Sequence, residues 1–217
     1  MSELASSANG PSTARDDVLA RIRTARGDTP VPPVARGYRT ADGRPAGDPA
    51  LLDLLVDRLE DYQATVLRCT SGEVAATVAT ALAELPGSVV VAPGVPTGWR
   101  PEGAHEDDGR PAVALADHAA TVTGVAVAIA DTGTLILDGS PLSGRRALSL
   151  LPDRLVCVVE AAQVVGTVPE GLAVLDPLAP LTMISGPSAT SDIELQRVEG
   201  VHGPRTLVVV LVDLTVA

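Results

Sequence analysis

The hydrophobic pattern of the chain switches between helical spacing and short continuous apolar runs. Leu51, Leu54, Leu55, Leu59 and Tyr62 recur at intervals of three and four residues, which predicts an amphipathic helix over residues 48–62. Continuous apolar runs are typical of strands that are covered on both faces. Runs of this kind predict strands at residues 64–69, 88–92, 121–130, 133–137, 154–159, 181–184 and 207–212.

Helix-start signals stand between several of these runs. The sequence Thr70-Ser71-Gly72-Glu73 matches a capping box and predicts a helix that continues through residue 85. Further helices are predicted at residues 16–26 and 169–175 and, as a short segment, after Ser188. This alternation predicts an α/β fold with a Rossmann-like, mostly parallel sheet flanked by helices. The strands at 181–184 and 207–212 are expected to close that sheet.

The length of 217 residues suits one α/β domain preceded by a less structured region. Residues 1–14 are small and polar and predict a disordered tail. Residues 15–47 combine the first helix with a segment rich in Pro, Gly and Arg, which is expected to be extended. The α/β domain is predicted to occupy residues 48–217.

Charge and composition exclude several classes of function. The net charge is −11 and lysine is absent, so the chain has no Walker-A or Schiff-base lysine and no basic stripe for nucleic acid. No apolar run approaches the roughly 18 residues of a membrane span, and the first residues lack a signal-peptide pattern. We therefore expect a cytoplasmic protein with no membrane span and no nucleic-acid partner.

The two cysteines, Cys69 and Cys157, each lie inside an apolar run and are expected to be buried, reduced thiols. Two cysteines cannot ligate an iron–sulfur cluster that needs four thiolates. His105 and His118 have no metal-ligand spacing to each other or to a cysteine. The chain alone is therefore predicted to bind no cofactor and no metal.

A first candidate site lies at the corner between the runs 121–130 and 133–137. Asp131 would act there as a catalytic carboxylate at a strand end, where open α/β sheets bind ligands. Thr132, Gly133 and Thr134 would add hydroxyl and backbone N–H donors for a substrate. The alternative is a simple hairpin turn in which Asp131 bonds to its own backbone.

A second candidate site is the loop at residues 139–146, which ends in Arg145-Arg146. A guanidinium group binds a carboxylate or a phosphate in a fork geometry, so Arg145 is a candidate substrate ligand. The alternative is a pair of solvated surface arginines.

A third candidate site follows the run 181–184. The N–H groups of Ser185-Gly186-Pro187-Ser188 and of the helix predicted after it would hold an anion. Asp192 and Glu194 would either cap that helix or receive an arginine.

A fourth candidate site precedes the last predicted strand. His202 would act there as a general acid or base, or bind an anion. Gly203 and Arg205 would bind the substrate, and Arg205 is, like Arg145, a candidate partner for a substrate carboxylate. The alternative is a histidine that is bonded to a neighbouring loop carbonyl.

The order and spacing of these segments resemble the LUD-domain family, and within it the members called lactate-utilisation protein C (LutC/YkgG). The resemblance spans about residues 122–213 and rests on five segments: Ile129-Ala-Asp-Thr-Gly-Thr-Leu, Arg145-Arg-Ala-Leu-Ser-Leu-Leu-Pro152, Ile184-Ser-Gly-Pro-Ser188, Ser191-Asp-Ile-Glu194 and Gly200-Val-His-Gly-Pro-Arg205. Asp131 stands where the family more often has glutamate, so a glutamate nucleophile of the CoA-transferase kind is not expected.

The resemblance implies a fold similar to the NagB/RpiA/CoA-transferase superfamily and a role in oxidising L-lactate to pyruvate. It also implies separate iron–sulfur lactate-utilisation proteins as partners. We therefore expect a subunit of this system that binds a small organic anion. Homo-oligomerisation stays open.

Two other functions stay open, because no complete set of nucleophile, base and orienting group can be assembled from the sequence. One is a non-catalytic sensor or scaffold module for a small anion. The other is a transferase or isomerase for a phosphorylated or CoA-linked substrate. The candidate site as a whole requires the four corners to share one rim of the sheet.

Overall fold

The computed structural model describes residues 13–27, 32–38, 40–83, 85–187, 189–190, 198–199 and 203–213. The chain divides between Tyr38 and Arg39 into two units. The first unit holds helix α1 (Ala14–Arg26), which begins two residues before its predicted start. Thr13 and Asp16 form a reciprocal capping box at its N-terminus, and no residue of α1 is buried. The rest of the predicted tail, residues 1–12, lies outside the described residues.

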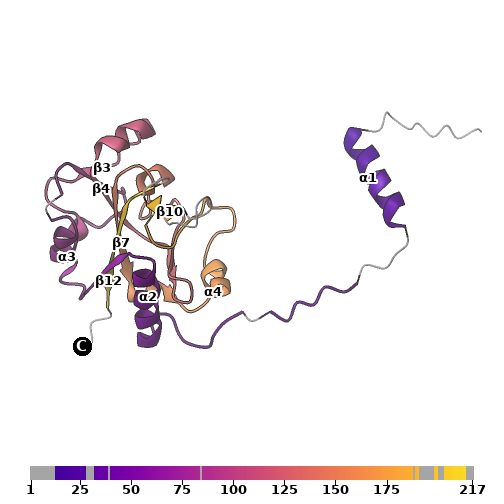
Figure 1. Cartoon of the computed structure of the whole chain (residues 1–217), viewed down its shortest axis with the longest axis horizontal. Coiled ribbons are helices and arrows are strands. Elements are labelled where there is room, and N and C mark those ends of the chain that lie inside the picture. Colours follow the sequence, from indigo (N-terminus) through magenta and orange to yellow (C-terminus); the bar gives the residue numbers. More distant parts are fainter. Residues whose placement is uncertain are drawn as a thin grey trace, which may run out of the picture. The chain divides into compact units, whose positions relative to one another are not determined.

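The second unit contains the remaining helices and all the strands (Figure 1). Its helices are α2 (Pro49–Asp61), α3 (Val74–Ala81) and α4 (Val168–Ala173). Its longer strands are β1 (Thr65–Cys69), β4 (Ala120–Gly124), β6 (Thr134–Leu137), β7 (Arg154–Glu160) and β12 (Thr206–Val212). Its shorter strands are β2 (Val89–Val91), β3 (His105–Glu106), β5 (Val127–Ile129), β8 (Val164–Val165), β9 (Thr182–Ile184), β10 (Ala189–Thr190) and β11 (Val198–Glu199). Short 3-10 turns include η3 (Arg146–Ser149).

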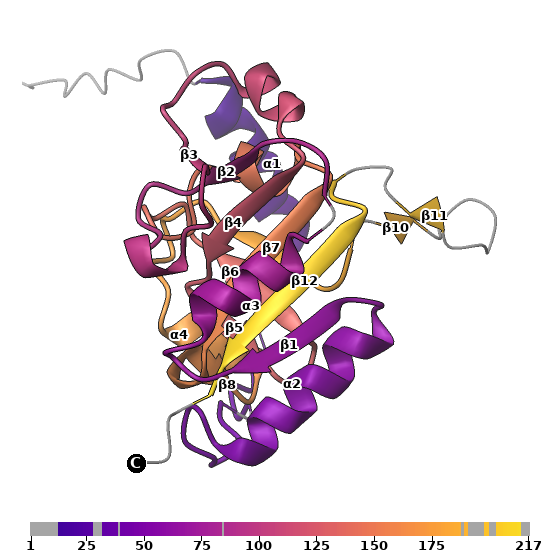
Figure 2. The same cartoon turned by 90° about the vertical axis from the view of Figure 1, so that its left-hand side faces the viewer.

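Six strands form a fully parallel sheet in the order β1-β12-β7-β4-β2-β3 (Figure 2). The two central strands, β7 and β12, are rich in valine and leucine, and the residues between their ends are buried. Such runs suit a parallel sheet that is covered on both faces. The predicted α/β fold with a parallel sheet flanked by helices is confirmed.

Alternate residues of the central strands enter two separate cores. Leu207, Val209 and Leu211 of β12 pack toward α2, whereas Val208 and Val210 pack toward α3. Figure 1 views the parallel sheet close to edge-on, with α3 on one side and α2 and α4 on the other. Burial of each such side chain stabilises the fold by about 1.5–3 kcal/mol.

A second, four-stranded sheet shares the core on the α2 side of the parallel sheet. Its order is β8-β5-β6-β9, with β5–β6 and β6–β9 antiparallel and β5–β8 parallel. Its buried residues in the core that contains Leu211 are Ala128, Leu135, Leu137 and Val164. The Gly47 N–H donates to the Val164 carbonyl over 2.9 Å, so the segment before α2 is joined to β8.

The prediction of one strand over residues 121–130 is wrong. The segment forms β4 and β5, which belong to different sheets. The backbone changes partners at the break, because the Gly124 N–H donates to Leu142 O and the Ala126 N–H to Ile136 O. The Leu142 side chain lies where a Cβ on Gly124 would be, so only glycine fits at this point.

The strands predicted to close the sheet are present in other places. The run 181–184 is β9, at the edge of the second sheet, and the run 207–212 is β12, inside the parallel sheet. The prediction of a helix directly after Ser188 is also wrong for its first residues, because Ala189–Thr190 forms strand β10 and pairs antiparallel with Val198–Glu199.

The helix predicted from Thr70 is shorter than expected and ends at Ala81. It begins at Val74, and its N-cap residue Glu73 makes no side-chain hydrogen bond to the helix. The Glu73 carboxylate instead accepts from both the N–H and the hydroxyl of Thr70, in the turn before the helix. Among the described residues, no helix combines the length and the apolar character that a membrane crossing requires.

Candidate functional site

An open cavity of about 280 Å³ lies against η3, β9 and the first residues of β7 and β12. Its apolar wall includes Leu150, Leu155, Met183 and Leu207. Its polar side chains come from Arg146, Ser149, Thr182 and Ser185, and backbone comes from Gly186, Pro187 and Gly203. An apolar cavity with a few polar groups is the usual form of a small-molecule site.

Arg146 gives this cavity its charge. It opens the η3 turn, and the Ser149 hydroxyl donates to its carbonyl over 3.0 Å, which closes the turn. Among the described residues that line the cavity, Arg146 is the one charged side chain, and no described group forms a hydrogen bond or an ion pair with its guanidinium. A free guanidinium group facing a cavity is suited to binding a carboxylate or a phosphate.

A second cavity of about 200 Å³ adjoins the first. It shares Arg146, Ser149 and Thr182 with it, and its other lining residues are Leu137, Gly139, Gly144, Arg145 and Pro180. The loop that forms it is tightened by a 2.7 Å hydrogen bond from the Gly144 N–H to Ser140 O. Gly144 has φ +69 and packs against Ala92 and Leu148, which leaves no room for a side chain. Arg146 therefore borders two cavities.

Arg145, the arginine chosen from the sequence, is held by a carboxylate. Its Nε and Nη2 donate to the two carboxylate oxygens of Asp107 over 2.7 and 2.8 Å. The Asp107 side chain is only 6% exposed, so this pair is largely shielded from solvent. The fork geometry predicted for a substrate is thus used within the protein, which argues against Arg145 as the substrate ligand. Sequence alone could not separate it from Arg146, because Asp107 lies 38 residues away.

The Asp131 corner is a hairpin turn between β5 and β6. The Gly133 N–H donates to Ala130 O over 3.3 Å, and the Asp131 N–H donates to Gly166 O over 3.0 Å. The Gly133 amide was predicted to hold an anion, but it already donates within the turn, and the neighbouring Asp131 amide is also used. Asp131 is exposed and is not among the described residues that line the two cavities.

The first and third corners meet through their hydroxyl groups. The Thr134 hydroxyl lies 2.7 Å from the Thr132 hydroxyl and 2.8 Å from the Ser185 hydroxyl. Register explains this contact, because β6 and β9 pair Leu135 with Ile184 and the neighbouring residues are Thr134 and Ser185. Gly186, at φ +89, turns the chain against Tyr62 at the end of α2.

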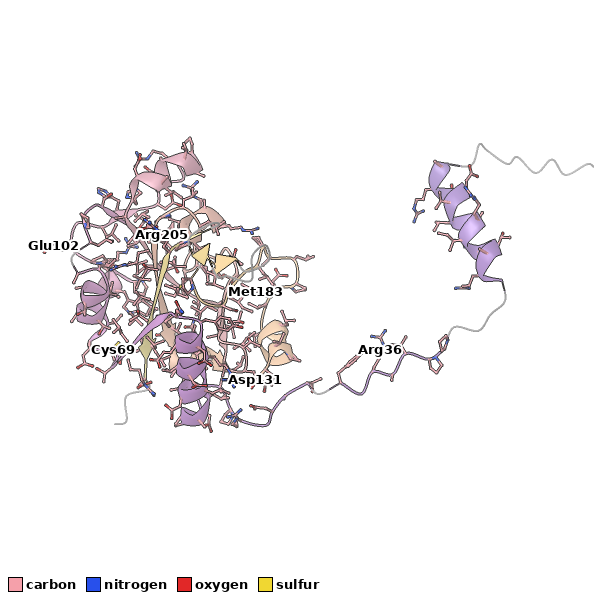
Figure 3. All side chains as sticks on the ribbon, in the orientation of Figure 1. Arg36, Cys69, Glu102, Asp131, Met183 and Arg205 are labelled. Atoms are coloured by element: carbon pink, nitrogen blue, oxygen red, sulfur yellow. The ribbon has the colours of Figure 1, made fainter. Side chains whose placement is uncertain are left out.

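The fourth corner contributes Gly203 to the cavity, whereas Arg205 is paired elsewhere. The Arg205 Nε and Nη2 each donate to a carboxylate oxygen of Asp153 over 2.6 Å, and this pair is exposed. The hydrogen bond from Arg205 lowers the pKa of Asp153. Figure 3 shows Arg205 near the top of the parallel sheet and Asp131 near the lower end of α2, so the expectation of one shared rim is wrong for these two residues.

Four predicted site residues lie outside the described residues, namely Ser188, Asp192, Glu194 and His202. The structure brings Ser185, Gly186, Pro187 and Gly203 to one cavity and places Thr132 and Thr134 behind it. Their roles as substrate ligands stay predictions.

Both cysteines are buried and neither forms a disulfide. Burial raises the pKa of the Cys157 thiol to about 12 and also raises the pKa of the Cys69 thiol. Neither is therefore an activated thiolate. The rings of His105 and His118 lie 5.8 Å apart, and the described segments contain no group of three or more side chains that could hold a metal ion.

Comparison with known proteins gives consistent matches. The LUD domain family matches residues 102–212. The chain is 45% identical over 169 residues to "Lactate utilization protein C" of Deinococcus radiodurans, which covers 75% of this chain and 79% of that protein. It is 32% identical over 126 residues to the Bacillus pumilus protein of the same name, where the match covers 54% of this chain and 50% of the relative.

One solved structure is similar over most of its length. It is the crystal structure of a DUF162 family protein from Deinococcus radiodurans, with a TM-score of 0.65 and 38% sequence identity. The match covers 76% of this chain and 97% of that chain.

Proposed function

Because this chain belongs to the LUD domain family, we propose that it takes part in lactate utilisation by binding a small organic anion, L-lactate or pyruvate, in the cavity at Arg146. The single observation that supports the site is the Arg146 guanidinium, which has no partner within the described part of the chain and stands among described lining residues that carry no other charge. All the described lining residues fall within the stretch that matches the family, residues 102–212.

The chemistry of the cavity suits a short carboxylic acid. Arg146 offers two parallel N–H donors to a carboxylate, and the Leu155 and Leu207 side chains offer an apolar surface to a methyl group. Ser185 and Thr182 offer hydroxyl groups to a further oxygen of the ligand.

In this proposal, separate iron–sulfur proteins of the cytoplasm carry out the electron transfer of lactate oxidation. The full sequence has two cysteines, and both are buried in strands of the parallel sheet. Four thiolates are needed for a cluster of the common kinds, so the clusters would reside in partner chains.

Calorimetric titration of the full chain with L-lactate and with pyruvate tests the anion site. Both ligands are expected to bind, and Arg146→Gln is expected to weaken binding about 10- to 100-fold, because hydrogen bonds to charged groups contribute about 1.5–3 kcal/mol. The free energy of unfolding should stay unchanged in this variant, since the Arg146 side chain is exposed, its guanidinium forms no bond with another described group, and the hydrogen bond from Ser149 goes to the Arg146 backbone carbonyl.

Arg21→Gln in α1 is the matched control, because it removes the same charge from an exposed residue of the other unit. It should bind both ligands like the parent. Absence of binding by the parent, or equal weakening in the two variants, would contradict the proposed site.

A second candidate is a non-catalytic module that binds the anion for its partners. The observation that favours it is the lining of the cavity, where Arg146 is the one ionisable side chain among the described residues and no general base accompanies it. Incubation of the purified chain with L-lactate and an artificial electron acceptor separates the two. Turnover without partners would refute the module, and binding without turnover would support it.

A further inference from the structure

Three hydroxyl groups form a continuous chain that ends at the cavity. Ser185 lines the cavity and is exposed. Thr134 lies behind it, only 8% exposed, and Thr132 follows, half-buried. The two oxygen–oxygen distances are 2.8 Å and 2.7 Å, which are those of ordinary O–H···O hydrogen bonds.

The direction of this chain can reverse. In both hydrogen bonds either oxygen can be the donor. If Thr132 donates to Thr134 and Thr134 donates to Ser185, the Ser185 O–H is left to donate into the cavity. If each hydroxyl turns around, the Ser185 oxygen is left to accept, and Thr132 donates outward. Each hydroxyl has one proton and two lone pairs, so both arrangements keep the two hydrogen bonds between the hydroxyl groups. The longer contact of 3.5 Å, in which the Thr134 hydroxyl donates to the Thr132 carbonyl, is given up when Thr134 donates to Ser185.

We propose that this chain makes the cavity specific for acids with an oxygen at carbon 2, and that it binds the 2-hydroxy and the 2-oxo form alike. Ser185 contacts the ligand, and Thr134 and Thr132 act as positioning residues through it. An alcohol donates to Ser185, whereas a ketone accepts from Ser185. This inference rests on the proposed function, in which Arg146 holds the carboxylate.

The second sheet fixes the chain in place. Thr134 starts β6 opposite Ser185, and the turn between β5 and β6 is packed by Gly133 against Arg58 of α2. Gly186, the residue after Ser185, packs against Tyr62 in the same way. Because both turns are held by α2, the two hydroxyls keep their separation without a ligand, which lowers the ordering cost of binding.

The test uses the full chain and three probes, L-lactate, pyruvate and propionate, of which propionate lacks the oxygen at carbon 2. The parent should bind L-lactate and pyruvate more tightly than propionate. Thr134→Val removes the hydroxyl and keeps the shape, and it should weaken both oxygenated probes about 3- to 10-fold while leaving propionate unchanged. Thr134→Ser should restore the parent preference.

Ser185→Ala supplies a second variant at an exposed position, so the test does not depend on the folding of a variant at a buried site. It should lose the same preference for L-lactate and pyruvate over propionate. Equal binding of the three probes by the parent would overturn this inference and leave the Arg146 site standing. Equal weakening of all three probes by Thr134→Val would show a structural role and would also overturn it. Binding of none of them would refute the proposed function itself.

Discussion

The parallel sheet and the four-stranded sheet of the second unit differ in strand length and in their relation to the candidate site. In the parallel sheet, β7 and β12 are seven residues long, and their alternate side chains fill the cores on both faces. In the four-stranded sheet, β8, β5, β6 and β9 have two to four residues each, and Met183 of the edge strand β9 is 54% exposed.

The candidate chemistry gathers around the smaller sheet. The hydroxyl chain starts at the β5–β6 turn and ends at the residue after β9, and β9 itself lines the cavity. The parallel sheet contributes only apolar side chains to that cavity, Leu155 and Leu207. The central strands β7 and β12 of the parallel sheet are buried, and so are β5 and β6 of the smaller sheet, whereas the edge strand β9 beside the cavity is only partly buried. Substitutions in β12 and in β9 should therefore have separable effects.

The largest expected effect is a loss of stability from the centre of the parallel sheet. Leu211→Ala should lower the free energy of unfolding by about 2–5 kcal/mol, because the side chain is completely buried and its loss leaves a cavity. Met183→Ala, the matched truncation in the smaller sheet, should cost less than about 1 kcal/mol. Urea unfolding midpoints of the two variants measure the difference. Similar losses in both would break the comparison between the sheets.

The interior of the parallel sheet should also make the protein sensitive to alkali. Burial raises the pKa of the Cys157 thiol from 9.0 to about 12, so the folded state keeps this proton after the unfolded chain has released it. The stability associated with the neutral thiol is complete below pH 9 and is lost as the pH rises toward 12. Between these two pH values the loss approaches about 1.4 kcal/mol for each pH unit.

Unfolding of the parent and of Cys157→Ala between pH 8 and about pH 11 checks this dependence. The parent should lose stability more steeply than the variant over that range. If the stability of the two proteins falls with the same slope, the Cys157 thiol is not shielded from solvent, and water reaches the centre of the sheet more than its burial indicates.

Much of the fold is predictable because its signals are local. Each continuous apolar run of β7 and β12, and each helical spacing of the leucines in α2, involves residues only a few positions apart. The break between β4 and β5 is not local. It depends on Leu142 filling the space beside Gly124, and the apolar run gives no sign of a contact with a loop 18 residues further on.

The site was less predictable for the same reason. Ser185, Gly186, Pro187 and Gly203 are polar or small residues beside strands, and the structure brings them to one cavity, whereas their role as ligands stays a prediction. The choice between Arg145 and Arg146 depends on where one carboxylate, Asp107, lies in space. The Gly133 and Asp131 amides donate to the carbonyls of Ala130 and Gly166, and the sequence alone does not reveal these hydrogen bonds.

Two bidentate pairs with the same chemistry and different burial give the smallest and sharpest test. Arg145→Ala should lower the free energy of unfolding by about 1–3 kcal/mol, because it leaves Asp107 shielded from water and without its two charged donors. Arg205→Ala should cost less than about 1 kcal/mol, because Arg205 and Asp153 are 67% and 52% exposed and water replaces the lost bonds. Chemical denaturation of both variants, with Asp107→Ala and Asp153→Ala to complete the two double-mutant cycles, measures each coupling.

The contribution of the exposed Arg205–Asp153 pair to stability should disappear in acid. Arg205 lowers the pKa of Asp153 below 3.8, so the pair stabilises the folded state above that pH and its contribution disappears as the pH falls through the lowered pKa. The parent and Arg205→Ala should therefore have the same free energy of unfolding in strong acid. At neutral pH the parent should be more stable by less than about 1 kcal/mol. A coupling for Arg205 as large as that for Arg145 would mean that burial does not decide the strength of these pairs. An arginine without a partner would then be a weaker sign of a ligand site, because even the exposed arginines of this protein would gain appreciably from a carboxylate.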